Sequence, residues 1–355
     1  MQRSGIEPDD YKQRSYLSAV EAARYLDISV DEIHDMVKQK KIDAMISASG
    51  QMRFRLIDIK RFEEQKSPDG KIESKGIKQI TDIKVNETLQ RVVFGNSQEM
   101  EMIEDNSVHL MITSPPYFDA KMYARTQLDG NLGDIHDTTI WFEEIKKVWR
   151  EVYRVLQPGR KAFINIMNLP IRDQANGFRS LNLVGHTIDV CEELGFIFKR
   201  DIVWSKTNSV RAHFGSYPYP GGILINNSHE FILEFEKPCE YGSKKYLHLT
   251  QEQKETSRLD KEFWLSVKNS DVWQMAPEGS GDNRAHVAPF PRELPFKLIK
   301  AFSYVGETVL DPFMGSGTTL SVAADLGRNG IGFEIVEEIA SQAINSIKAY
   351  QVKLY

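Results

Sequence analysis

The stretch "ETVLDPFMGSGTTLSVAADLGRNGIGFEI", residues 307–335, contains a strand, a glycine turn, a helix and a second strand in succession. The apolar run "TVLD" enters a turn with Gly315 and Gly317, a helix is predicted from Thr318, and "GIGFEI" follows as a strand. A strand, a crossover helix and a second strand form the unit from which parallel sheets are built. The stretch therefore predicts an α/β fold.

The turn in this stretch also predicts a ligand site. Glycines let a ligand approach the backbone closely, and Glu334, at the end of the next strand, is placed to accept hydrogen bonds from ribose hydroxyls. A phosphate loop is excluded because no Lys follows the last glycine, and the glycine spacing is not that of a dinucleotide fingerprint. Asp311 would repel a pyrophosphate. It suits a cationic nucleoside that carries an amino acid, and S-adenosylmethionine is such a ligand.

A second candidate loop lies in "HLMITSPPYFDAKMY", residues 109–123. An apolar strand ends there in Ser114, Pro115, Pro116 and Tyr117. A proline has no backbone donor and forces the residue before it into an extended conformation, so the loop is stiff. Loops at the carboxyl ends of buried strands hold the ligand sites of open α/β sheets. The loop is therefore a second candidate for the functional site.

From Val92 onward, apolar runs alternate with amphipathic helical stretches, which predicts a parallel α/β sheet. The runs are "RVVFG", "VHLMIT", "KAFINIM", "FIFKRDIVW", "EFILEF", "ETVLDPF" and "NGIGFEI".

The N-terminal segment predicts a separate small domain. Ser18 stands three residues before Glu21, and Ser29 three before Glu32, which are capping-box signals for two short helices. Residues 42–58 alternate around a "SASG" turn and predict a hairpin or wing. Residues 38–61 hold seven basic residues against two acids, a local charge suited to DNA although the whole chain has a net charge of −5.

This segment resembles the winged helix-turn-helix modules of the MerR and excisionase types. The resemblance implies a DNA-binding domain over residues 1–65. The alternative for this segment is a helical module that docks on the main domain or forms a dimer contact. Residues 66–87, rich in Lys, Gly, Ser and Asp, are predicted to be a linker.

Composition limits the class of protein. With 355 residues and 41% hydrophobic content, the chain suits a soluble globular protein of two or three domains. No apolar run approaches the roughly 18 residues of a transmembrane helix, and "MQRSGIEPDD" is not a signal peptide, so a cytoplasmic protein is expected. The two cysteines, Cys191 and Cys239, are too few for a disulfide framework or a cysteine zinc site, and no metal is expected.

Taken together, "TSPPY" and the later "DPFMGSGTT" resemble the amino-methylating DNA methyltransferases of the permuted beta order. The similarity covers about residues 88–345 and extends to "GNSQEMEMIEDNSVHLMITSPPYF", "VWREVYRVLQPGRKAFINI", "DIVWSKTNS", "SHEFILEFEK" and "HVAPFPRELPFKLIKAF". It implies a Rossmann-like S-adenosylmethionine-dependent methyltransferase domain over residues 88–355, with a target-recognition insertion around 205–283. Duplex DNA is the implied partner. The resemblance leaves open whether a cognate restriction endonuclease is a second partner.

The resemblance implies a role for each residue of the tetrad Ser114, Pro115, Pro116 and Tyr117. An exocyclic amine is a poor nucleophile because its lone pair is delocalised into the base. The Ser114 hydroxyl and the Pro115 carbonyl would each accept one amine hydrogen, which directs the lone pair at the methyl sulfonium. Tyr117 would stack on the flipped base.

The resemblance also implies a set of cofactor-binding residues. Glu334 would bind the ribose, Asn96 would face the adenine where the family commonly has Asp, and Phe290, followed by Pro291, would close over the cofactor. An Asn offers both a donor and an acceptor. The methionine part would lie among Asp311, Phe313, Gly315, Gly317 and Thr318.

Ser114 at the first tetrad position favours the 4-amino group of cytosine, and the 6-amino group of adenine is the alternative. Cys239 follows Pro238 but lacks the sequence context of carbon-5 methyltransferases. Other open alternatives are a DNA-binding regulator on an inactive methyltransferase scaffold and an RNA or protein methyltransferase. Candidates for contacts with DNA are Lys121, Arg125, Arg211, His213, Lys244 and Lys245.

Overall fold

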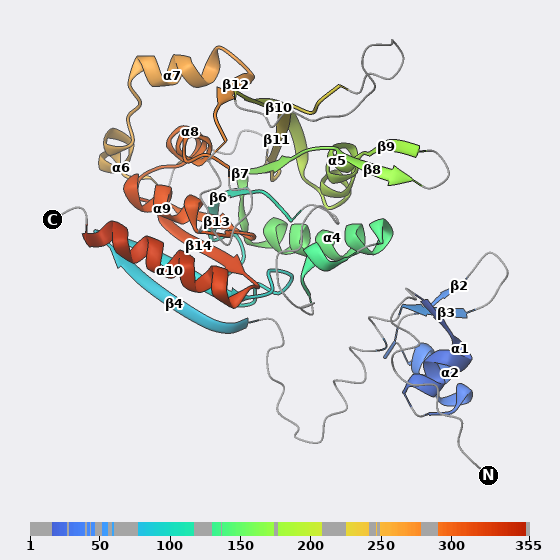
Figure 1. Ribbon diagram of the computed structural model, residues 1–355. Helices are drawn as coiled ribbons and strands as arrows, with labels where there is room; N and C mark the ends of the chain where they lie inside the picture. Colours follow the sequence, from blue (N-terminus) through green and yellow to red (C-terminus); the bar gives the residue numbers. More distant parts are fainter. Residues whose placement is uncertain are drawn as a thin grey trace, which may run out of the picture. The chain divides into compact units, whose positions relative to one another are not determined.

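The computed structural model describes residues 16–26, 28–39, 41–42, 44–46, 52–55, 59, 77–116, 130–135, 137–173, 177–207, 225–240, 246, 249–277 and 290–352. The chain divides into two compact units, Met1–Glu73 and Ser74–Tyr355 (Figure 1). Each unit has a hydrophobic core of its own.

The described residues of the N-terminal unit form two capped helices and a three-stranded sheet. Its elements are β1 (Tyr16–Ser18), α1 (Ala19–Tyr25), α2 (Val30–Lys38), β2 (Met45–Ile46) and β3 (Met52–Arg55), with strand order β1-β3-β2. Both predicted capping boxes are present: the Glu21 carboxylate accepts from Ser18, and Glu32 accepts from Ser29 at 2.8 Å. The predicted helix pair and hairpin are confirmed, and the "SASG" turn lies outside the described residues.

The larger unit contains a nine-stranded sheet of order β12-β10-β11-β7-β6-β13-β14-β5-β4 among the described residues. Its strands are β4 (Ile77–Val85), β5 (Thr88–Gly95), β6 (Val108–Thr113), β7 (Leu156–Ile166), β10 (Ile197–Lys206), β11 (His229–Glu236), β12 (Val272–Met275), β13 (Thr308–Asp311) and β14 (Asn329–Glu334). A separate hairpin joins β8 (Leu169–Asp173) to β9 (Gly177–Leu181). The predicted α/β fold is confirmed.

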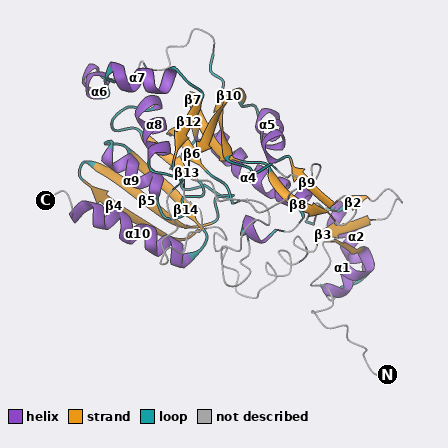
Figure 2. Cartoon of the chain, turned by 45° about the horizontal axis from the view of Figure 1, so that its top comes forward, coloured by secondary structure: helices purple, strands orange, loops and turns teal. Residues whose placement is uncertain are grey.

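Helices cover both faces of the sheet (Figure 2). They are α4 (Thr138–Val155), α5 (Leu183–Glu193), α6 (Gln251–Thr256), α7 (Lys261–Lys268), α8 (Glu293–Phe302), α9 (Thr318–Asp325) and α10 (Glu337–Val352), with a short 3-10 helix, η2, at Leu132–Asp134. On β6, Met111 packs in the core of α4 and α5, whereas Leu110 and Ile112 pack in the core of α8. A strand buried on both faces needs an unbroken apolar run, which explains "VHLMIT".

The sheet is mixed rather than wholly parallel. β5, β14, β13, β6 and β7 run parallel to one another, but β11 is antiparallel to both β7 and β10, and β4 is antiparallel to β5. The predicted target-recognition range 205–283 includes β11, whose Ile232, Leu233 and Phe235 are fully buried in the sheet core. An apolar run marks a buried strand but does not give its direction.

The predicted linker over residues 66–87 is wrong from Ile77 onward, where the chain forms β4. This edge strand buries Ile83 and Val85 against Ala343 and Ile347 of α10, while its Lys and Asp side chains face solvent. Only one face of β4 is apolar, so its composition resembles that of a polar linker.

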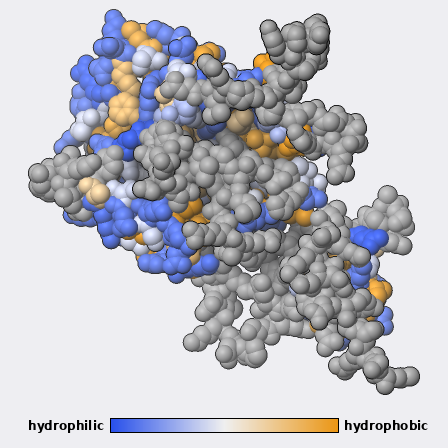
Figure 3. Space-filling model, viewed as in Figure 1, coloured by the Kyte–Doolittle hydropathy of each residue, from blue (hydrophilic) through white to orange (hydrophobic). Residues whose placement is uncertain are grey.

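The surface of the described residues is mostly hydrophilic on the face drawn in Figure 3. Helices α6 and α7 bury none of their residues fully, and Trp264 on α7 is 46% exposed. No described helix combines the length and the apolar character needed to cross a bilayer.

Candidate active site

One pocket opens at the carboxyl edge of the parallel strands. The chain leaves β6 toward β7 on one side and β13 toward β14 on the other, so the topological switch point lies between β6 and β13. Ligands of open α/β sheets bind at such a point. The lining residues are Gly95, Asn96, Ser97, Ser114, Pro115, Pro116, Gly130, Asn131, Leu132, Phe290, Pro312, Phe313, Met314, Ser316, Thr318, Phe333, Glu334, Ile335, Val336 and Ile339.

The pocket brings together most of the residues that the sequence singled out. Both candidate loops contribute to it, together with the end of β5 and the end of β14. Eight predicted residues line it, namely Asn96, Ser114, Pro115, Pro116, Phe290, Phe313, Thr318 and Glu334. Asp311, Gly315 and Gly317 do not line it. Tyr117, Lys121, Arg125, Arg211, His213, Lys244 and Lys245 lie outside the described residues.

The glycine turn takes its shape from its place before α9. Gly317 is the N-cap residue of α9 and has φ +80, a left-handed conformation that disfavours other residues. A Cβ there would also stand 3.2 Å from the Cβ of Ala343 on α10. The Met314 amide donates to the Phe333 carbonyl at 3.0 Å, which ties the turn to β14. The turn is thus fixed next to Glu334.

Glu334 is a half-buried carboxyl group in the pocket wall. Burial raises its pKa to about 7, and the nearby charge of Asp311 acts in the same direction. Backbone N–H groups of Val336, Ile335 and Gly315 oppose this shift, and the Val336 amide donates to Oε1 at 2.9 Å. The Glu334 carboxyl group therefore titrates near neutral pH. It lies in the pocket wall, where a hydroxyl group of a ligand could donate a hydrogen bond to it.

Asn96 is held by a chain of amide contacts that explains why Asp is absent here. Its Nδ2 donates to Gln98 Oε1 at 3.0 Å, and its Oδ1 accepts from the Gln98 amide. Gln98 Nε2 in turn donates to the backbone and side chain of the buried Glu144. Because Glu144 accepts from Gln98 Nε2, the Gln98 Oε1 atom faces residue 96. Residue 96 must therefore supply a hydrogen-bond donor. Asn supplies one, and an ionised Asp does not.

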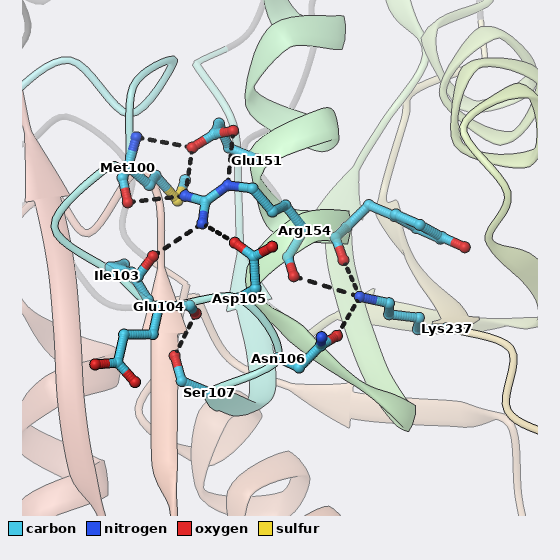
Figure 4. A network of polar contacts seen from close by, with 10 residues as sticks. Met100, Ile103, Glu104, Asp105, Asn106, Ser107, Glu151, Arg154 and Lys237 are labelled. Carbon is cyan, nitrogen blue, oxygen red and sulfur yellow. Dashed lines mark hydrogen bonds and ion pairs between the residues drawn. The ribbon is translucent and has the colours of Figure 1, made fainter.

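A polar network anchors the loop that follows β5 (Figure 4). The Met100 amide donates to Glu151 at 3.0 Å, while Arg154 donates to the carbonyls of Met100 and Ile103, each at 2.9 Å. Lys237 donates to the carbonyl of Tyr153 at 2.6 Å, near the end of α4. The loop that begins with Asn96 is therefore fastened to α4 through side chains that lie outside the pocket.

Ser114 follows the last residue of β6 and is half-buried in the pocket. Its hydroxyl donates to the Asn165 carbonyl on β7 at 3.1 Å. The Asn165 Nδ2 lies 3.4 Å from the same hydroxyl and donates to the buried Glu230 at 2.5 Å. Lys206 pairs with Glu230 at 2.6 Å. Because the hydroxyl hydrogen is committed to Asn165, a lone pair of Ser114 is available to accept a donor from a ligand.

Asp311 lies behind the pocket wall. It is 1% exposed, and burial raises its pKa to about 6. Its carboxylate accepts from the Thr113 hydroxyl at 2.7 Å and from the Thr319 hydroxyl at 2.6 Å. The sequence correctly predicted that Asp311 ends a strand. The position in the strand alone does not give the direction of the side chain.

The walls of the pocket fit a nucleoside. Aromatic and aliphatic side chains such as Phe290, Phe313 and Ile335 can cover a flat base, and Glu334 can accept from ribose hydroxyls. Asn96 retains donor and acceptor capacity beyond its bonds to Gln98. Because the loop after β6 contributes Ser114 and Pro115 to the same pocket, a group carried by the nucleoside could meet a second substrate there.

Several site residues escaped the sequence analysis. Gly130, Asn131 and Leu132 line the pocket, although the sequence analysis named only Lys121 and Arg125 in the segment after the tetrad, as candidates for DNA contacts. The signal was "DGNLGD", a turn with its own Asn cap: Asn131 accepts from the Gly133 amide at 3.1 Å. Asn165 and Glu230 were also missed. Buried polar residues inside apolar strands such as "FINI" and "HEFILEF" mark such positions.

Comparison with known proteins places the chain in a family. Residues 108–345 match the DNA methylase family, and residues 16–67 match the helix-turn-helix domain family. The type II methyltransferase M.MjaI of Methanocaldococcus jannaschii is 35% identical over 279 residues, which cover 70% of this chain and 88% of that protein. M.MthZI of Methanothermobacter thermautotrophicus is 33% identical over 266 residues, covering 70% and 73%.

Solved structures agree with this assignment. The Thermus thermophilus protein TTHA0409, solved in complex with S-adenosyl-L-methionine, is 33% identical with a TM-score of 0.56, over 72% of this chain and 94% of that one. The cytosine-N4-specific PvuII DNA methyltransferase is 19% identical with a TM-score of 0.53, over 74% and 91%, and supports the fold alone.

The chain belongs to the DNA methylase family. It is an S-adenosylmethionine-dependent DNA methyltransferase with the corresponding α/β fold, related to type II enzymes of restriction–modification systems, and it carries a helix-turn-helix domain. The predicted cofactor is confirmed.

Proposed function

We propose that this enzyme methylates the exocyclic 4-amino group of cytosine in duplex DNA. The observation that supports the base is Ser114 at the first position of the "SPPY" tetrad, with its hydroxyl hydrogen committed to Asn165. In the family that the sequence resembles, Ser at this position accompanies cytosine and Asp accompanies adenine. We further propose the permuted beta class, because Ser114 precedes the glycine turn of residues 315–317 along the chain.

The tetrad performs its part through hydrogen-bond acceptance. The Ser114 hydroxyl and the Pro115 carbonyl each accept one hydrogen of the target amine, so the nitrogen lone pair leaves the plane of the base. Tyr117, outside the described residues, stacks on the base after it is flipped from the duplex. No residue forms a covalent bond to the base, and Cys239 has no part in the reaction.

The remaining pocket residues hold the cofactor. Bound S-adenosylmethionine supplies an electrophilic methyl group. Glu334 accepts from the ribose, Asn96 faces the adenine, and Phe290 covers it, while Phe313 and Thr318 lie along the methionine part. Gly315 and Gly317 keep the turn free of side chains, which allows the ligand to approach the backbone.

The base is identified by incubating the purified protein with radiolabelled S-adenosylmethionine and unmethylated bacterial genomic DNA, followed by digestion to nucleosides. Label in 4-methylcytosine is expected. Label in 6-methyladenine would keep the enzyme class and overturn the base. Absence of label in every nucleoside, with cofactor binding intact, would favour the regulator or a substrate other than DNA.

For the N-terminal unit we propose contacts to DNA beside the catalytic domain, with residues 205–283 as the target-recognition region. Deleting residues 1–65 should weaken binding of duplex DNA and flatten its salt dependence, because each lost phosphate contact lowers the logarithmic salt slope by about 0.9. Fluorescence anisotropy across a salt series measures both quantities. If the salt slope and the DNA affinity are both unchanged, the unit instead docks on the main domain or forms a dimer contact.

A further inference from the structure

Two loops leave the sheet side by side: the loop after β6, which carries Ser114 and is called the catalytic loop, and the loop after β13, which carries Phe313 and the glycine turn and is called the cofactor loop. β6 ends at Thr113, immediately before Ser114, and β13 ends at Asp311, immediately before Pro312 and Phe313 of the pocket wall. The two strands are parallel neighbours, with Leu310 in register with Met111. Any displacement of one strand end relative to the other changes the distance between the acceptors of the target amine and the site of the methyl donor.

One buried carboxylate connects these strand ends. Asp311 Oδ1 accepts from the Thr113 hydroxyl at 2.7 Å and from the Phe313 amide at 3.1 Å, while Oδ2 accepts from the Thr319 hydroxyl at 2.6 Å. Thr113 and Thr319 are fully buried. Three segments therefore converge on one side chain: the end of β6, the pocket wall and the first turn of α9.

The same geometry argues against a direct ionic contact with the cofactor. Asp311 is 1% exposed and does not line the pocket, so a cationic amine in the pocket would have to displace a neighbouring segment to reach it. Its two oxygens already hold three donors, each fixed by secondary structure or by a buried side chain. The acidic residue is thus engaged by the protein itself.

We infer that Asp311 is a positioning residue that locks the catalytic loop to the cofactor loop through Thr113, rather than a ligand of the S-adenosylmethionine ammonium group. This rests on the proposed role of Ser114 in methyl transfer. Small displacements of reacting groups cost large factors in rate, so the lock acts on turnover more than on cofactor affinity.

Asp311→Asn separates the two roles of this side chain. An Asn oxygen can still accept from Thr113 and Phe313, and its amide can donate to Thr319, whose hydroxyl rotates to accept. The substitution therefore keeps the lock and removes the charge. We expect the dissociation constant for S-adenosylmethionine, measured by calorimetry, to stay within about threefold of the wild-type value.

Thr113→Val tests the lock itself. It removes the donor next to Ser114 and leaves the pocket lining untouched, so we expect the turnover number for DNA methylation to fall by about 10-fold to 100-fold, with cofactor affinity within about threefold. Thr113→Ser restores the hydroxyl and should recover most of the turnover. Thr187→Val, at an equally buried Thr on α5 that does not line the pocket, is the control for loss of a buried hydroxyl.

Two results overturn the inference, and either suffices. One is a loss of cofactor affinity of more than about tenfold in Asp311→Asn, the loss expected for a charge-assisted hydrogen bond to the ligand. The other is unchanged turnover in folded Thr113→Val, with folding judged by its melting temperature against Thr187→Val. If the wild-type enzyme methylates no DNA, the proposed function fails first, and the Asp311→Asn calorimetry still decides the role of this residue.

Discussion

Replacing Ser114 with alanine should lower the rate of methyl transfer to DNA by about 10²-fold to 10³-fold, the loss typical of removing one preorganised hydrogen-bond partner from a transition state. The amine nitrogen must become more tetrahedral as the methyl group arrives, and the Ser114 hydroxyl is one of its two proposed acceptors. Its orientation is fixed in advance by donation to the Asn165 carbonyl at 3.1 Å. Single-turnover transfer of labelled methyl groups to DNA measures the effect.

Cofactor affinity separates this outcome from a general disturbance of the pocket. The dissociation constant for S-adenosylmethionine should remain within about threefold in Ser114→Ala, because the substitution removes one oxygen atom from the wall. Ser107→Ala is the control: this hydroxyl donates to the Glu104 carbonyl at 2.7 Å, lies outside residues 205–283 and does not line the pocket. A Ser114→Ala enzyme with wild-type turnover would remove this hydroxyl from the mechanism.

The two loops of the pocket were predictable from sequence because each carries its signal locally. Prolines after an apolar run and glycines before a helix mark strand ends, and the carboxyl ends of parallel strands share one edge of the sheet. The sequence therefore predicted that Ser114, Phe313 and Glu334 lie near one site, and all three line one pocket.

The contacts that orient these residues were not predictable in the same way. Asn165, which contacts Ser114, and Glu230, which accepts from Asn165, lie 51 and 116 positions beyond Ser114, on strands whose apolar pattern suggests only burial. Gln98, which holds Asn96, is itself held by Glu144 46 positions away, a pairing that no spacing rule encodes. Such partners depend on strand order and on register, which are properties of the whole sheet.

Asp311 shows the same limit within a single motif. Its position at the end of β13 suggested contact with the ligand, yet its side chain turns toward β6 and α9. The prediction failed to include Thr113 because the hydroxyl belongs to a strand 198 residues earlier in the chain. A motif therefore locates the loop, while the neighbouring strand determines what its acidic residue touches.

Lowering the pH from 8 to 6 should weaken S-adenosylmethionine binding by about tenfold, because Glu334 must be ionised to accept both ribose hydrogens well. Burial raises its pKa to about 7 in the free enzyme, and hydroxyl donors from the ligand favour the ionised form. At pH 6 most of the free enzyme carries protonated Glu334, and the cost of removing that proton appears as lost affinity. At pH 8 the group is already ionised, so affinity reaches a plateau. Calorimetry at four or five pH values measures the curve.

Glu334→Gln identifies this carboxyl group as the source of the pH dependence. The variant keeps an oxygen that can accept from the Val336 amide but has no titratable proton, so its affinity should be lower at pH 8, by about 10-fold to 100-fold, and nearly flat down to pH 6. Any titration of the ligand itself is common to both proteins and cancels in the comparison.

Glu338→Gln, at an exposed acid in the first turn of α10, controls for the change in net charge. Because Asp311 is buried away from the ligand, its own protonation should not reproduce the effect in Glu334→Gln. An equal pH slope in wild type and Glu334→Gln would place the titrating group elsewhere.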